Sequence, residues 1–182
     1  TMQIKREELV YFQEQGTKQW SSRWQQVAQF QHQDARGFAV KKTYFGEGAE
    51  RIVYQMTEID CNGLPVGDSF VAKDSKFVLQ QGRQPGFFHR NFVKTQMKAN
   101  KWATKFNKKL DDFGIDAMVP RLEFLACSVY VCQDAHNGIE KSYLIEKRLD
   151  PALYKKWNGN AIVNRFMEFA PPCIDAAAEA FR

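Results

Sequence analysis

Three segments rich in β-branched and aromatic residues follow one another between residues 38 and 79. They read FAVKKTYF (38–45), ERIVYQMTEI (50–59) and SFVAKDSKFVL (69–79), and the turn-forming stretch DCNGLPVGD joins the last two. Short segments of this composition, bounded by Gly, Pro, Asn and Asp, are typical of strands joined by tight turns. The pattern predicts an antiparallel meander, and this prediction restricts the fold more than any other feature of the sequence.

A long helix and two further strands are predicted after the meander. Between residues 87 and 110 the apolar residues recur at spacings of three, four or seven: Phe88, Phe92, Ala99, Ala103, Phe106 and Leu110. The segment at 119–132 is apolar on both alternating faces, as expected for a strand covered on both sides. A last strand is predicted at 142–149, and a helix interrupted by Pro171 and Pro172 from about residue 162.

The N-terminal region carries a different pattern. Residues 5–12 and 18–31 are polar and rich in Gln, while Trp20, Trp24, Val27 and Phe30 recur at helical spacing. We therefore predict an amphipathic helix in an N-terminal helical extension, residues 1–36, ahead of a main domain at 37–182. Such a helix could also serve a homodimer contact or a regulatory contact. The length of 182 residues suits one domain with a full core, or one large and one small lobe.

Charge and cysteine content narrow the class of protein. The net charge of +5 and the pI near 9.0 are compatible with an anionic ligand, though many soluble domains share them. The four cysteines, Cys61, Cys127, Cys132 and Cys173, have no spacing typical of zinc, and no His has a second ligand at metal spacing. No metal site is therefore expected. The absence of a membrane-length apolar segment and of a signal-peptide core predicts a cytoplasmic protein without a membrane partner.

The stretch FGEGAERIVYQM, residues 45–56, has two interpretations. Its two glycines could form a simple hairpin turn, or they could let a phosphate approach the backbone. Lys73 lies among Val71, Ala72 and Phe77 on the third strand of the meander, where a lysine is costly to bury unless it meets an anion. The alternative for Lys73 is an edge strand from which the side chain extends to solvent.

Glu146, in the last predicted strand, is a candidate for contacting a base. Its carboxylate could accept a hydrogen bond from an adenine amino group, with backbone groups at Leu149 offered to the ring. The alternative is a cross-strand partner for Lys147 or Arg148.

Five blocks of the sequence resemble the alpha-kinase family of atypical protein kinases, in the same order and at similar spacings. These are GEGAERIVY, FVAK, VKTQMKANKWATKFN, YLIEKRLDPALYKKWNGN and the terminal AAAEAF, and the resemblance covers about residues 37–182. It implies an α+β fold: a protein-kinase-like N-lobe with an antiparallel sheet and a long helix, followed by a hinge. The family's C-lobe, with its zinc site and catalytic aspartate, would lie beyond residue 182, so the C-lobe is expected to be truncated.

The resemblance also implies phosphoryl transfer from Mg²⁺-ATP to Ser or Thr of a protein substrate. It assigns ATP binding to Gly46, Gly48, Ala49, Arg51, Lys73, Glu146, Leu149 and Lys156. The glycine loop would cover the phosphates, Lys73 would hold the α- and β-phosphates, and Glu146 with the Leu149 backbone would contact adenine. No catalytic residue is assigned. Relatives often carry an acid where this chain has Lys98, so a lysine–carboxylate pair is either missing or formed with a carboxylate elsewhere.

Two other functions stay open at this point. A pseudokinase or interaction module could use the same lobe to bind partners without phosphotransfer. Nucleic-acid binding is the least favoured, because a row of lysines on a helix is usually only a solvated face; the lysines concerned are Lys94, Lys98, Lys101, Lys105, Lys108 and Lys109.

Overall fold

The structure is a computed structural model, and it describes residues 2–17, 19–76, 85–115, 119–134, 136, 138 and 140–153. The chain divides into two compact units, residues 1–97 with 125–148 and residues 98–124 with 149–182. The helix predicted from residue 162, together with Lys156, lies outside the described residues. Within the described part of the chain, no helix is long and apolar enough to cross a membrane.

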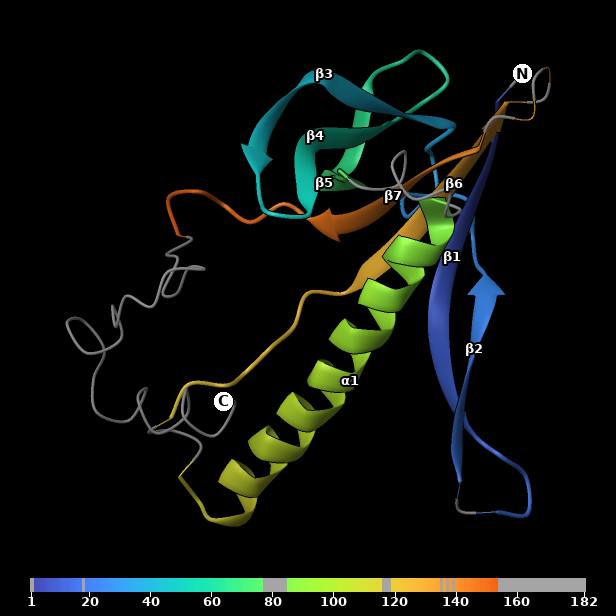
Figure 1. Cartoon of the computed structure of the whole chain (residues 1–182). Helices are drawn as coiled ribbons and strands as arrows, with labels where there is room; N and C mark the ends of the chain where they lie inside the picture. The colour runs from blue at the N-terminus through green and yellow to red at the C-terminus, as the bar shows by residue number, and fades with distance from the viewer. Residues whose placement is uncertain are drawn as a thin grey trace. The chain divides into compact units, whose positions relative to one another are not determined.

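The first unit is built on one antiparallel sheet (Figure 1). Its order is β2-β1-β6-β7-β5-β4-β3, and every neighbouring pair is antiparallel. The strands are β1 (Met2–Gln13), β2 (Trp20–Gln26), β3 (Gly37–Glu47), β4 (Arg51–Ile59), β5 (Pro65–Ser75), β6 (Cys127–Asp134) and β7 (Glu140–Lys147). With the helix α1 (Pro85–Asp112), they confirm the α+β class.

The predicted meander is confirmed as β3, β4 and β5. β4 pairs with both neighbours along most of its length, from Arg51 opposite Ser75 to Ile59 opposite Pro65 and Gly37. β3 is an edge strand, and its register shifts twice between Val40 and Gly46, just before the glycine loop. Such bulges increase the local twist and bend the strand, so they determine the direction in which the β3–β4 turn projects.

Apolar cores form on both faces of the sheet. On one face Leu9, Val129 and Leu144 pack against Val93 of α1, with Phe92 and Met97 beside them. On the other face a second cluster joins strands from both halves of the sheet: Met56, Phe70, Ala72, Tyr130, Tyr143 and Ile145. Because β6 and β7 contribute to both clusters, their two-sided apolar pattern is explained by burial on each face. The helix predicted at 87–110 is confirmed, and the structure extends it to 85–112.

The predicted N-terminal helix is wrong, because residues 2–13 and 20–26 form β1 and β2. β1 pairs with β6 on one side and with β2 on the other, where Leu9 lies opposite Trp24. A spacing of four places Trp20 and Trp24 on one side of a helix, but it also places them on one face of a strand. The choice between helix and strand therefore depends on β6, because β1 pairs with its edge. β6 is distant in the sequence, so the local pattern cannot reveal this pairing. The boundary at residue 37 and a homodimer contact stay predictions.

The strand predicted at 119–132 begins only at Cys127. The preceding segment belongs to the second unit, where Asn107 of α1 holds it with two hydrogen bonds. Its side-chain amide donates to the Leu122 carbonyl at 2.8 Å, and its carbonyl oxygen accepts from the Leu122 amide at 3.0 Å. These bonds replace strand pairing, so an apolar segment is ordered without belonging to the sheet.

His89 in the first turns of α1 is fully buried. Its Nε2 lies 3.1 Å from the Ser142 carbonyl of β7, and its Nδ1 has no partner among the described residues. Burial lowers the pKa of His89 from 6.5 to about 4, against the opposing effect of Asp74. The ring is therefore neutral at pH 7.

We expect the protein to lose stability as the pH falls from 6.5 to 4, because the unfolded chain binds a proton at His89 that the folded chain does not. The slope from this group is about 1.4 kcal/mol per pH unit at most. Urea unfolding across this range measures it, and His89→Gln should flatten the slope whatever its effect at pH 7. An unchanged slope in the variant would assign the acid sensitivity to other groups.

Candidate nucleotide-binding site

The glycine loop closes as a tight β3–β4 turn. The Gly48 amide donates to the Arg51 carbonyl at 2.8 Å, and residues 47–50 are exposed. Neither Gly46 nor Gly48 has a positive φ. A Cβ at Gly48 would find its nearest neighbour, the Arg51 carbonyl oxygen, at 4.0 Å, and one at Gly46 would meet only Val53, at 3.6 Å. The fold itself therefore does not require glycine at either position.

Lys73 is held by a buried carboxylate. It lies on β5, between β7 and β4, so the edge-strand alternative is excluded. Its Nζ lies 2.5 Å from Oε2 of Glu146, and the two side chains are 23% and 5% exposed. The other oxygen of Glu146 is buried and accepts no hydrogen bond from the described residues. A hydrogen-bond donor or a charged group of a ligand could therefore pair with this oxygen of Glu146 beside Lys73.

Arg51, the first residue of β4, is close enough to Glu146 for the two charges to interact. Its guanidinium carbon lies 3.5 Å from the centre of the Phe92 ring and 5.4 Å from that of Phe88, both on α1. Burial lowers the pKa of Arg51, against opposing effects of Glu50 and Glu146. Nε has no partner among the described residues. Stacking on aromatic rings holds the guanidinium in place without consuming its hydrogen-bond donors.

These residues share the face of the sheet that α1 covers. Lys73 lies opposite Val53 on one side and Leu144 on the other, and Glu146 lies opposite Cys127. Burial and the nearby Glu146 raise the pKa of Cys127 to about 12, so its thiol is uncharged. Two cationic side chains, Lys73 and Arg51, thus lie near the Glu146 carboxylate, and Glu50 adds a second carboxylate near Arg51. Cationic side chains at this place are suited to an anionic ligand.

The structure brings together three of the eight predicted ATP-binding residues, namely Arg51, Lys73 and Glu146. It places Gly46 near the end of β3, and Gly48 and Ala49 in the adjoining turn. Leu149 is 44% exposed and belongs to the second unit, and Lys156 lies outside the described residues. The cross-strand alternative for Glu146 does not hold, because Lys147 pairs with Asp68 at 2.9 Å and Arg148 lies over Phe45. Glu146 is instead the carboxylate that pairs with Lys73.

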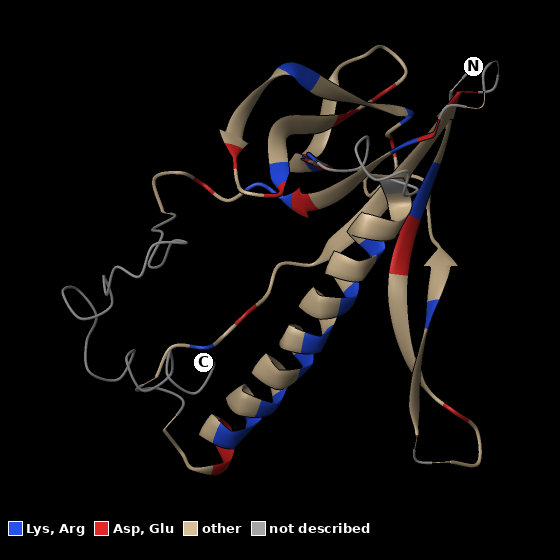
Figure 2. Cartoon of the chain, viewed as in Figure 1, with Lys and Arg blue, Asp and Glu red and all other residues tan. Residues whose placement is uncertain are grey.

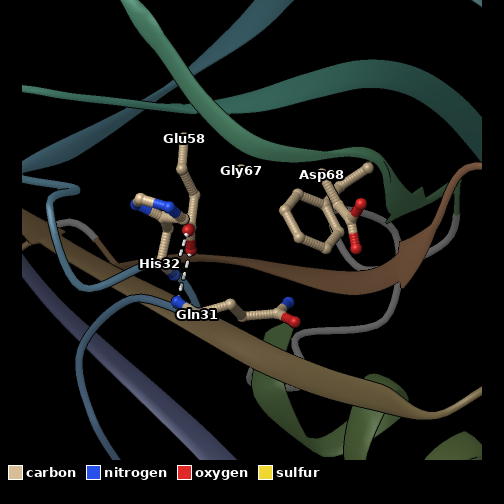
Figure 3. Close-up of a pocket in the computed structure, with 6 residues that line it drawn as sticks. Gln31, His32, Glu58, Gly67 and Asp68 are labelled. Carbon is tan, nitrogen blue, oxygen red and sulfur yellow. Dashed lines mark hydrogen bonds between the residues drawn. The ribbon is translucent and has the colours of Figure 1, made fainter.

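Sequence reasoning missed a second buried acid, Glu58, on the opposite face. Its two oxygens accept hydrogen bonds from the backbone amides of Gln31 and His32, each at 2.7 Å (Figure 3). One of them also accepts from the Tyr130 hydroxyl at 2.7 Å. Burial and the neighbouring Glu58 raise the pKa of Tyr130. The carboxylate thereby ties the segment after β2 to β4 and β6, beside a pocket of about 370 Å³ that Asp68 and Phe70 help to line. An acid in an alternating strand was the only signal in the sequence.

Among the described residues, no group of three or more His, Cys, Asp or Glu side chains could hold a metal ion. Cys61, Cys127 and Cys132 are free thiols. The described part of the site therefore presents cations to an anionic ligand and offers no cluster of ligands for Mg²⁺ or zinc.

The described residues thus combine a seven-stranded antiparallel sheet, one long helix and a lysine–carboxylate pair near the glycine turn. The model of the alpha-kinase family matches residues 46–182. The chain belongs to the alpha-kinase family.

Solved structures of alpha-kinase domains are similar to this chain, whereas no curated protein matches it. The alpha-kinase domain of myosin heavy chain kinase A with AMPPCP is 20% identical, with 80% of this chain and 60% of that chain covered and a TM-score of 0.46. The C-terminal truncated alpha-kinase domain of myosin heavy chain kinase is 20% identical, with 82% and 63% covered and a TM-score of 0.48. The chain thus spans less than two thirds of the length of these structures.

Proposed function

We propose that this chain provides the ATP-binding lobe of a protein kinase that phosphorylates Ser or Thr. The observation that carries the proposal is the Lys73–Glu146 pair at 2.5 Å, with Arg51 stacked beside it on the face that α1 covers. In phosphoryl transfer, the substrate hydroxyl oxygen bonds to the γ-phosphorus while the bond to the β–γ bridging oxygen breaks. The protein contributes mainly position and compensating charge.

Each predicted residue has a definite part in this proposal. Lys73 would place its charge at the α- and β-phosphates, with Glu146 holding its side chain extended toward them. Arg51 would add a second cation, whose Nε has no hydrogen-bond partner among the described residues. Gly46, Gly48 and Ala49 would let the turn approach the phosphates closely, since none presents a large side chain. Contacts to adenine from the Glu146–Leu149 segment, and a role for Lys156, complete the proposal.

Mg²⁺ would neutralise the charge of the phosphates when ATP is bound. Because the described residues offer no cluster of ligands for it, no step is assigned to a metal held by them.

The pseudokinase alternative shares the nucleotide site and differs only in phosphotransfer. Autophosphorylation or transfer to myelin basic protein, measured with radiolabelled ATP in the full-length protein, would distinguish the two.

We expect Mg²⁺-ATP at about 100 times its Kd to raise Tm by about 5–10 °C, because a ligand that binds only the folded state adds about 2.7 kcal/mol at that concentration. Gly48→Ala should leave Tm unchanged without nucleotide, since a Cβ there has room, while weakening ATP binding about tenfold by blocking close approach. Thermal shift measures both. ATP binding equal in the two proteins would refute the role of the glycine turn, and no shift in the wild type would refute the nucleotide site.

A further inference from the structure

The outward face of α1 in the second unit carries an unbroken row of lysines. Lys98, Lys101, Lys105, Lys108 and Lys109 are all exposed, and their spacings of three, four and one place them on one side of the helix. Ala103 and Leu110 are buried on the opposite side. In Figure 2 the ribbon segments of α1 that belong to Lys and Arg, coloured blue, follow one another along the helix. The row spans about 16 Å at the helical rise of about 1.5 Å per residue.

This row is not neutralised by the helix itself. No Asp or Glu occurs between residues 85 and 110, and the first acids are Asp111, which pairs with Arg121, and Asp112. Among the described residues, Lys98, Lys105, Lys108 and Lys109 form no ion pair with a carboxylate. Like charges three and four residues apart destabilise a helix slightly. The arrangement therefore brings no benefit to the helix alone.

Exposed aromatic side chains flank the lysines. Trp102 is 56% exposed and Phe113 is 73% exposed, and their separation of eleven residues places them on the same side of the helix axis. The Phe113 amide donates to the Lys109 carbonyl, so the helical path continues to this residue. Exposed aromatic side chains are enriched at protein–protein interfaces, where polar residues surround them at the rim.

We propose that the surface formed by these five lysines and Trp102 of α1, together with Phe113 directly after the helix, is a docking surface for an acidic protein segment. The segment would present Asp or Glu to the lysines and apolar side chains to Trp102 and Phe113. A polypeptide is favoured over nucleic acid for two reasons. The row contains no arginine, the residue best suited to bidentate phosphate contacts. In addition, the Lys105 Nζ lies 4.6 Å over the Trp102 ring, which occupies one face on which a base would stack.

The test measures binding of a fluorescein-labelled peptide of repeated Glu-Glu-Leu-Phe units by fluorescence anisotropy. Lys105→Glu with Lys108→Glu should weaken binding at least about tenfold, because like charges then face each other. The matched control reverses two exposed lysines of β3, Lys41→Glu with Lys42→Glu, and should change binding less than about twofold. Trp102→Ala should weaken binding about threefold or more through lost apolar contact. Circular dichroism verifies that each variant folds.

Should charge reversal reduce the helix content, the neutral pair Lys105→Gln with Lys108→Gln replaces it, with a smaller expected loss of about threefold. The proposal fails if the β3 control weakens binding as much as the α1 variant, since the peptide would then sense only net charge. It also fails if the peptide does not bind, or if a labelled oligouridine binds more tightly than the peptide. These outcomes do not depend on ATP, so they are independent of the nucleotide site.

Discussion

Lys73→Met is expected to lower the free energy of unfolding by about 3 kcal/mol and to abolish the rise in Tm that Mg²⁺-ATP produces. Glu146 is only 4% exposed, and Lys73 is the cation that compensates it at 2.5 Å. Its removal takes the paired cation away from a buried carboxylate and leaves only the more distant charge of Arg51, and this costs far more than the loss of a surface ion pair. Urea unfolding measures the first effect and an ATP titration measures the second.

The double variant Lys73→Met with Glu146→Gln separates these two effects. It should recover most of the lost stability, because the buried Glu146 carboxylate is replaced by a neutral amide, yet it should still fail to bind ATP. If the double variant is as unstable as the single one, Lys73 stabilises the fold through packing rather than through the ion pair. If it binds ATP normally, Lys73 is not a phosphate ligand. The nucleotide proposal would then lose its principal observation.

Glu58→Ala is expected to destabilise the protein by about 3 kcal/mol, because the backbone amides of Gln31 and His32 and the Tyr130 hydroxyl all lose their acceptor. Tyr130→Phe removes only one of these bonds and should cost about 1 kcal/mol. The matched control is Glu123→Ala on the surface, which should stay within about 0.5 kcal/mol. Guanidinium unfolding compares the three variants. A cost for Glu58→Ala no larger than that of the control would show that solvent replaces the carboxylate.

The sequence pattern correctly predicted those strands and helices whose apolar residues keep one periodicity along their whole length. The meander and α1 alternate or repeat over many residues, and the structure confirms both within a few residues. The same reasoning failed at Trp20 and Trp24, where one spacing satisfies both a helix and a strand, and at 119–126, where an apolar segment forms hydrogen bonds to a helix instead of a sheet. In both places, partners distant in the sequence decide the structure.

Some residues of the candidate site could likewise be predicted from the sequence, and others could not. The glycine turn and Lys73 could be found from residue type, spacing and order along the strands, because a turn and its next strands are local. The carboxylate that pairs with Lys73 could not be identified, since Glu146 lies 73 residues away and reaches Lys73 only because β7 inserts beside β5. Arg51 was predicted from its place in the loop, but its stacking on Phe92 depends on how α1 packs against the sheet.

By itself, the sequence determined the strand and helix content of the central region, the position of the turn and membership of the alpha-kinase family, because periodicity and motif order are properties of neighbouring residues. Tertiary structure alone decided that the N-terminal region adds two strands beside β6. It also decided that Glu146 and Glu58 are buried, where Glu146 pairs with Lys73 and Glu58 accepts hydrogen bonds from the segment after β2. The physical reason is burial. A carboxylate takes its role from the partners that replace water around it, and only the folded sheet brings those partners together.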